Sequence, residues 1–296
     1  MRKRVVFAAA VVALVLAPGS ASAWGFVAHR YITARAIDLL PPELKRFFDH
    51  FRDEVVVRAI DPDLWRSVGW EDDRNHFLDF GVREFGEYPF RELPRDYTAA
   101  LEKFGIATLR RDGLLPWREA EMFGNLRRTF ESFKGASVYG PSDAVLFAAA
   151  AGHYIQDAHQ PFHATNNFDG QLTGNNGIHA RFERDLVERF QSRLRVTPPP
   201  PKSITNARDA AFDALLTGYK LVDPILKADT EAIGAKEAYD DEYFEQFFTR
   251  VQPILEQRLG ESITATAGVI IGAWELAGRP PLATAGARPL EKVRRR

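Results

Sequence analysis

The sequence contains no cysteine, and this absence excludes several kinds of site. Its 296 residues also include only two methionines and seven histidines. A chain without cysteine forms no disulfide bond, offers no thiolate to a metal ion and carries no lipid on a cysteine. Any metal ion would therefore be bound through histidine, aspartate, glutamate or backbone atoms.

The sequence also lacks a strong charge of one sign. The formal net charge of the full chain is −1 at pH 7. General attraction to nucleic acid or anionic lipid requires clustered lysine and arginine. The charge balance therefore does not predict such attraction, although it leaves room for a local phosphate site.

Long apolar runs are missing as well, and the one short run predicts export. Val5–Ala17 is apolar over 13 residues, whereas a membrane-spanning helix needs about 18 or more. A basic start before this run and the small residues Ala21-Ser22-Ala23 after it are typical of a secretory signal peptide over residues 1–23. Cleavage there removes three basic residues and no acid, which changes the net charge from −1 to about −4. We expect a secreted or periplasmic protein with no transmembrane segment in the mature chain, beginning at Trp24.

Apolar periodicity and turn residues predict an all-α protein. Pro41-Pro42 is expected to start the second helix, and Ser142 with Asp143 to cap the fifth. A loop is expected between Asp61 and His76, because Pro62 and Gly69 fall there. The expected helices are 28–40, 42–58, 96–104, 116–134, 142–158, 177–194, 204–226, 239–257 and 259–277.

No shift in composition divides the chain into separate domains. The proline run "TPPPP" at residues 197–201 is expected to form a short extended connector. After Gly278 the chain becomes polar and proline-rich and ends in "EKVRRR". We expect one helical domain over residues 24–280, with a metal cleft between helices, followed by a disordered basic tail over residues 281–296.

Four of the seven histidines fall close together in the middle of the chain. His153 and Asp157 are four residues apart on a predicted helix, and so are His179 and Glu183. Residues at this spacing share one helix face, with Cβ atoms about 5–6 Å apart, so both side chains of a pair can bind one ion. His163 follows a proline that ends the helix, and it can point back to the same region from a loop.

Burial distinguishes this pattern from an ordinary surface ion pair. A single histidine–acid pair at this spacing is more often an exposed ion pair than a metal site. The stretch "LFAAAAGHYIQDA" around His153 and Asp157 is strongly apolar, which indicates that both side chains are buried. A buried carboxylate is unfavourable unless it is paired or bound to a metal.

A second polar stretch lies upstream. Asp61 and His76 are the candidates there, and Asp63 competes with Asp61 as the relevant carboxylate. Asp79 is a further candidate polar contact. Arg66 is a candidate phosphate contact, although a solvated arginine is the more common state of such a residue.

Together these residues resemble the zinc-dependent phospholipases C and the related single-strand-specific nucleases. The resemblance covers residues 24–183. It rests on nine positions, among them the motifs H-x3-D-x5-H and H-x3-E: Trp24, His29, Asp61, His76, His153, Asp157, His163, His179 and Glu183.

The resemblance implies three zinc ions. The α-amine and carbonyl oxygen of Trp24 would bind one of them, a chelate that exists only after signal cleavage. Asp157 would bridge two ions through its two oxygens. The implied ligand sets are Asp61, His76, His153 and Asp157 for the first ion, Trp24, His29 and Asp157 for the second, and His163, His179 and Glu183 for the third.

The implied activity is hydrolysis of a phosphodiester by a zinc-bound hydroxide, with Asp61 and Asp157 as catalytic residues. The segment "QPFHATNNF", Glu183 as the last ligand and the lack of cysteine favour a phospholipase C-like substrate. The segments "WGFVAH" and "GNNGIH" favour a single-strand nuclease or nucleotidase. Phe77 fits either reading, since it could stack on a base or line a headgroup pocket.

Two alternatives from other classes remain open. One is an exported zinc-binding protein without catalytic turnover, and the other is a helical binding protein without metal. The expected binding partner is the phosphodiester substrate, which is a phospholipid headgroup or a single-stranded nucleic acid. No protein partner is expected.

Overall fold

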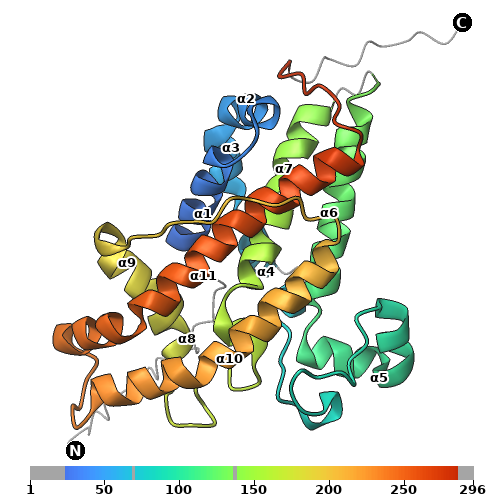
Figure 1. Ribbon diagram of the computed structural model, residues 1–296. Helices are drawn as coiled ribbons and strands as arrows, with labels where there is room; N and C mark the ends of the chain where they lie inside the picture. The colour runs from blue at the N-terminus through green and yellow to red at the C-terminus, as the bar shows by residue number, and fades with distance from the viewer. Residues whose placement is uncertain (1–23, 69–70, 136–138, 286–296) are drawn as a thin grey trace, which may run out of the picture.

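The computed structural model describes residues 24–68, 71–135 and 139–285 (Figure 1). The predicted signal peptide, residues 1–23, and residues 286–296 of the predicted tail lie outside the described residues. Within the described residues the protein is all-α, as predicted, and its one β-type pairing is an isolated bridge between Phe80 and Thr165.

Some of the helices follow one another directly, whereas residues 158–177 and 191–206 form longer connections. Short 3₁₀ turns occur at Asp73–Asn75, Arg83–Phe85, Pro161–Ala164 and Gln191–Arg193, and a π-helical segment at Arg181–Asp185. The α-helices are α1 (Phe26–Asp38), α2 (Pro42–His50), α3 (Arg52–Arg58), α4 (Asp61–Ser67), α5 (Tyr97–Asp112), α6 (Leu115–Ser132), α7 (Gly140–Asp157), α8 (Ile178–Ala180), α9 (Leu186–Phe190), α10 (Ala207–Ile233) and α11 (Asp241–Leu276).

Several predicted helix bounds are wrong, each for a local reason. The helices expected at 239–257 and 259–277 form the single helix α11, Asp241–Leu276, because its buried face continues from Leu255 through Leu259; the helix also runs through Pro253. Packing of a continuous apolar face outweighs the hydrogen bond that a proline removes. In contrast, the predicted helix 42–58 divides into α2 and α3 at Phe51.

The expected loop between Asp61 and His76 contains helix α4. Pro62 lies in the first turn of α4, where its missing N–H has no helical partner to lose. The predicted cap at Ser142 is also wrong, because α7 begins at Gly140 and the Ser142 hydroxyl donates to the Tyr139 carbonyl at 3.0 Å. Pro42 begins α2, as predicted.

Helix α7 lies at the centre of the bundle. It contacts α1, α3, α4, α6 and α11, and in Figure 1 α11 crosses in front of it while α6 runs beside it. The four alanines Ala148–Ala151 are buried, and their small side chains let the neighbouring helices approach closely. The carboxyl-terminal end of α7 carries His153 and Asp157.

Helices α10 and α11 form an antiparallel pair that holds the end of α7 (Figure 1). The guanidinium of Arg258 on α11 is fully buried and donates to the carbonyls of His159, at 2.8 Å, and Ala214, at 3.0 Å. Gly218 on α10 faces Pro161, so closely that a Cβ there would lie 3.3 Å from the proline Cα. The carboxyl-terminal half of the chain therefore fixes the turn that carries His163.

The segment that follows His76 lies beside the end of this turn. The Leu78 amide donates to the His163 carbonyl at 2.9 Å, and the Asn166 amide donates to the Phe80 carbonyl at 2.8 Å. Gly113 supports the segment that follows His76, because at its φ of +107° a Cβ would lie 2.1 Å from the Phe77 carbonyl oxygen. These contacts bring residues 76–80 against residues 163–166.

The start of the predicted tail packs on the domain. The Trp274 indole donates to the Pro280 carbonyl at 2.9 Å, and Leu282 contacts the core. Among the described helices, none combines the length and the apolar character that crossing a bilayer requires.

Glu119 on α6 generates a prediction about stability. Its side chain is fully buried and neither carboxyl oxygen has a hydrogen-bond partner, so burial raises its pKa well above 4.5. As the pH rises above 4.5 the unfolded chain ionises this group and the folded protein does not, which lowers the free energy of unfolding by about 1.4 kcal/mol per pH unit. We expect Glu119→Gln to gain melting temperature relative to the parent protein between pH 4.5 and 7, measured at equal metal content. Parallel pH profiles for the two proteins would contradict this expectation.

Candidate metal centre

Three groups of buried nitrogen and oxygen ligands lie near the end of α7. Within each group the potential ligand atoms are within 4.8 Å of one another. The first group is His29, His153 and Asp157, the second is Asp63, His76 and His153, and the third is His163, His179 and Glu183. The residues come from α1, α4, α7, the segment before Phe77, the turn at Pro161–Ala164, α8 and the π-helical segment. The tertiary structure thus gathers donors from widely separated parts of the sequence.

Asp157 lies between the first two groups, and its two oxygens face different neighbours. Oδ2 is 2.9 Å from His76 Nδ1 and 3.2 Å from His153 Nε2, whereas Oδ1 is 3.3 Å from His29 Nε2. Burial by itself raises the pKa of Asp157, but the neighbouring histidines hold that pKa well below its usual range. The two oxygens of Asp157 therefore face histidines of the first and the second group.

Several polar atoms in this region are buried without a hydrogen-bond partner. They are His29 Nε2, Asp63 Oδ2, Asp157 Oδ1 and His163 Nδ1. Buried polar atoms are nearly always paired in folded proteins. All four atoms belong to residues of the three groups, so a bound cation would supply the missing partner. The residues therefore fit metal ions held through nitrogen and oxygen.

In most of these imidazole rings, the nitrogen that points away from the cluster already has a hydrogen-bond partner. A ring nitrogen that donates a hydrogen bond leaves the other nitrogen free, with its lone pair, to bind a metal ion. Four of the five histidines are arranged in this way: His29 Nδ1 donates to Gln156 Oε1 at 2.6 Å, His153 Nδ1 to the Ala59 carbonyl at 2.8 Å, His179 Nδ1 to the Phe168 carbonyl at 3.0 Å, and His76 Nε2 to Asp72 Oδ2 at 3.1 Å.

The expectation that Asp61 is a ligand is corrected by the structure. Asp61 Oδ2 accepts from Arg58 Nε at 2.9 Å, and its side chain is 23% exposed. Asp63 is buried instead, with Oδ1 3.9 Å from His76 Nδ1. Side chains two residues apart on an α-helix point in directions about 200° apart around the helix axis. Asp61 and Asp63 therefore cannot both face the cluster. The candidate ligand at this position is therefore Asp63, and the structure does not support the catalytic role that was expected for Asp61.

The third group is built as the sequence predicts. His179 Nε2 is 2.9 Å from Glu183 Oε2 and 3.2 Å from His163 Nε2. The π-helical segment Arg181–Asp185 carries Glu183, and single π turns of this kind are frequent at functional sites. Gln160 Nε2 donates to Glu183 Oε2 at 2.9 Å and holds the carboxylate in place.

Trp24 lies directly beside the first group. Its side chain is fully buried, and the indole Nε1 donates to the Gln156 carbonyl at 2.8 Å. The preceding residue, Ala23, lies outside the described residues. The binding of a metal ion by a free Trp24 α-amine therefore remains a prediction.

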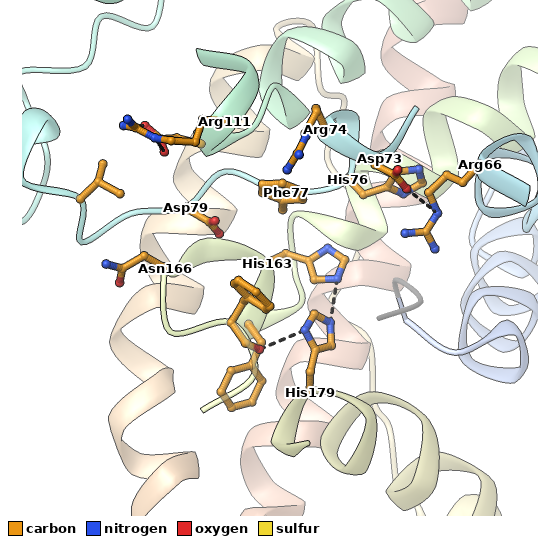
Figure 2. A pocket seen from close by; sticks show the side chains of 14 residues that line it. Arg66, Asp73, Arg74, His76, Phe77, Asp79, Arg111, His163, Asn166 and His179 are labelled. Atoms are coloured by element: carbon orange, nitrogen blue, oxygen red, sulfur yellow. Dashed lines mark hydrogen bonds and ion pairs between the residues drawn. The ribbon is translucent and has the colours of Figure 1, made fainter. Parts of the chain in front are cut away.

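A cavity of about 510 Å³ opens beside the second and third groups. In Figure 2, His163 and His179 lie at its centre, Arg66 lies to one side, and Asp79 and Asn166 lie to the other. Arg66 Nη2 also donates to Asp63 Oδ1 at 2.8 Å, which connects the cavity to the second group. The lining residues are Arg66, Asp73, Arg74, His76, Phe77, Asp79, Val82, Arg111, Asp112, Phe162, His163, Asn166, Phe168 and His179.

Asp79 is the unusual acid of this cavity. Burial and the nearby charge of Asp112 raise the pKa of Asp79 to about 8. At neutral pH its carboxyl is therefore mostly protonated and can donate as well as accept a hydrogen bond. Arg66, Arg74 and Arg111 also line the cavity, where Arg66 pairs with Asp63 and Arg111 pairs with Asp112.

Sequence reasoning missed the residues that orient the ligands. Gln156 and Gln160 flank Asp157 and were not singled out, and neither was Asp72. Asp72 is four residues before His76, the same spacing as the two recognised pairs. That spacing indicates a shared face only on a helix, and residues 72–76 form no α-helix.

A matched pair of variants tests the assignment of Asp63. We expect Asp63→Asn to weaken one metal site by tenfold or more, because it removes a charged donor from the second group. Asp61→Asn serves as the control and should leave the metal content unchanged. The measurement is metal content by mass spectrometry after dialysis against a graded series of chelator concentrations. Loss of metal from Asp61→Asn alone would restore the original assignment.

Comparison with known proteins adds no family to this geometry. No protein-family model matches the chain, and no curated protein matches it significantly. The likeness to zinc-dependent phosphoesterases therefore rests on the residues and their arrangement.

Proposed function

We propose that the protein is an exported hydrolase of phosphate esters that uses three zinc ions. The observation that carries this proposal is the position of Asp157, a buried carboxylate whose oxygens face histidines of the first and second groups, next to a cavity lined by residues of the second and third groups. Histidine nitrogens and carboxylate oxygens are the donors of catalytic zinc sites. The buried donor atoms without a hydrogen-bond partner support bound metal over a helical binding protein without metal.

The residues around the cavity have distinct roles in this proposal. Bound zinc would lower the pKa of water to about 7 and offset the negative charge of the phosphate. Asp63 and Asp157 would hold ions beside His76, which lines the cavity, and Arg66 lines the same cavity where it can contact a phosphate oxygen. Because Arg66 also pairs with Asp63, it would couple phosphate binding to the position of that ligand.

Two substrate classes fit the proposal. The sequence favours a phospholipase C-like substrate, and the apolar side chains of Phe77, Val82 and Phe168 in the cavity suit a lipid headgroup ester. The same cavity also favours a nucleotide, because Phe77 offers an aromatic face while Asp79 and Asn166 offer hydrogen-bonding groups.

Side-by-side assays decide between the classes. We expect the zinc-loaded protein to hydrolyse bis(p-nitrophenyl) phosphate and at least one of single-stranded DNA, RNA and dispersed phosphatidylcholine. Asp157→Asn should lower each rate by about 100-fold or more, because one residue would serve two ions. Zinc binding without turnover of any ester would indicate a zinc-binding protein instead.

Phe77 provides a test of the nucleotide alternative. Stacking of a base on an aromatic side chain contributes about 1–3 kcal/mol, so Phe77→Ala should raise KM for single-stranded DNA by about tenfold. The variant should leave hydrolysis of bis(p-nitrophenyl) phosphate nearly unchanged. An equal loss on both substrates would show that Phe77 supports the fold of the cavity and does not bind a base.

A further inference from the structure

We propose that Asp72 is a positioning residue that orients the His76 ring and sets the metal affinity of the second group. The proposal deepens the proposed function, since it concerns one of the metal sites on which that function rests. It stands on the hydrogen bonds around one imidazole ring and on the difference between this ring and the other histidines.

His76 lies between carboxylates. Its Nε2 donates to Asp72 Oδ2 at 3.1 Å, while Nδ1, on the other side of the ring, is 2.9 Å from Asp157 Oδ2 and 3.9 Å from Asp63 Oδ1. The contact with Asp72 therefore determines which nitrogen faces the second group. It also fixes the rotation of the ring about its axis.

Asp72 differs from the oxygens behind the other ligand histidines. The acceptors for His29, His153 and His179 are a side-chain amide oxygen and two backbone carbonyls, all of them neutral. A carboxylate behind an imidazole makes the ring a stronger donor to a metal ion. The second group should consequently bind its ion more tightly than a neutral acceptor would allow.

Three further groups hold Asp72 in place. The Tyr154 hydroxyl donates to Oδ2 at 2.6 Å, the Asn75 amide to Oδ1 at 2.7 Å, and Arg118 Nη2 to Oδ1 at 3.3 Å. The carboxylate is buried. Both of its oxygens are thus occupied, and the ring of His76 has a rigid support that reaches from α6 and α7.

The test measures zinc affinity and does not require turnover. Metal-free protein is titrated with zinc against a chromophoric chelator. Loss of a partner behind a ligand histidine typically weakens metal binding 10–100-fold, so Asp72→Asn should weaken one binding step by this factor and leave the others unchanged. Tyr154→Phe should weaken the same step less. Glu121→Gln is the matched control, because Glu121 is an exposed acid on the same arginine, 2.8 Å from Arg118 Nη1, without contact to His76.

Two further measurements separate positioning from a general structural role. The melting temperature of metal-free Asp72→Asn should stay close to that of Tyr154→Phe. In the metal-free protein, the Nε2–H of His76 should give a slowly exchanging NMR signal that disappears in Asp72→Asn and persists in Glu121→Gln. In the Asp63→Asn background, Asp72→Asn should add little to the loss of affinity, because both changes act on one site.

The outcomes distinguish this inference from the proposed function. Wild-type protein that binds and uses zinc while Asp72→Asn binds it equally well would overturn the role of Asp72 and leave the proposed function standing. Weakening of all binding steps alike would also overturn it. A selective loss in a protein that hydrolyses no phosphate ester would support Asp72 and reject the hydrolase. Wild-type protein that binds no zinc would reject both.

Discussion

The arrangement of the whole centre depends on one buried carboxylate. Asp157 has no contact with solvent, and an unpaired charge in such a place would strongly destabilise the fold. Its neighbours are histidines of α1, of the segment before Phe77 and of α7 itself, which contact both of its oxygens. Contacts with this charge hold α1, α7 and the segment before Phe77 close together. The same contacts leave donor atoms that a cation would complete.

The rest of the bundle serves to hold those donors still. Arg258 and Gly218, from the two long carboxyl-terminal helices, pack against the turn that follows Asp157. Gln156, which precedes Asp157, supports His29 with its side chain and Trp24 with its carbonyl. Rigid supports of this kind matter because ligand geometry must be set before a metal ion arrives. The long helices therefore contribute to the site without supplying a ligand.

The cavity combines charged, hydrogen-bonding and apolar side chains. Three arginines, an acid with a raised pKa and apolar side chains line one space that ends at ligand histidines. Positive charge and hydrogen-bonding groups suit a phosphate ester, and the apolar wall suits the group attached to it. The position of Arg66, between the cavity and Asp63, links the two parts.

The sequence by itself determined the all-α class and the third ligand group, because helical periodicity and i, i+4 spacing are local properties of the chain. His179 and Glu183 meet as their spacing predicts. The tertiary structure alone decided between Asp61 and Asp63, since that choice depends on which side chains of the short helix α4 face the cluster. Proline and glycine in this stretch had predicted a loop instead of a helix. The tertiary structure alone placed Asp72 behind His76, and brought His29 to a helix more than a hundred residues later in the chain. Contacts over such separations depend on how helices pack, and no short-range pattern in the sequence records them.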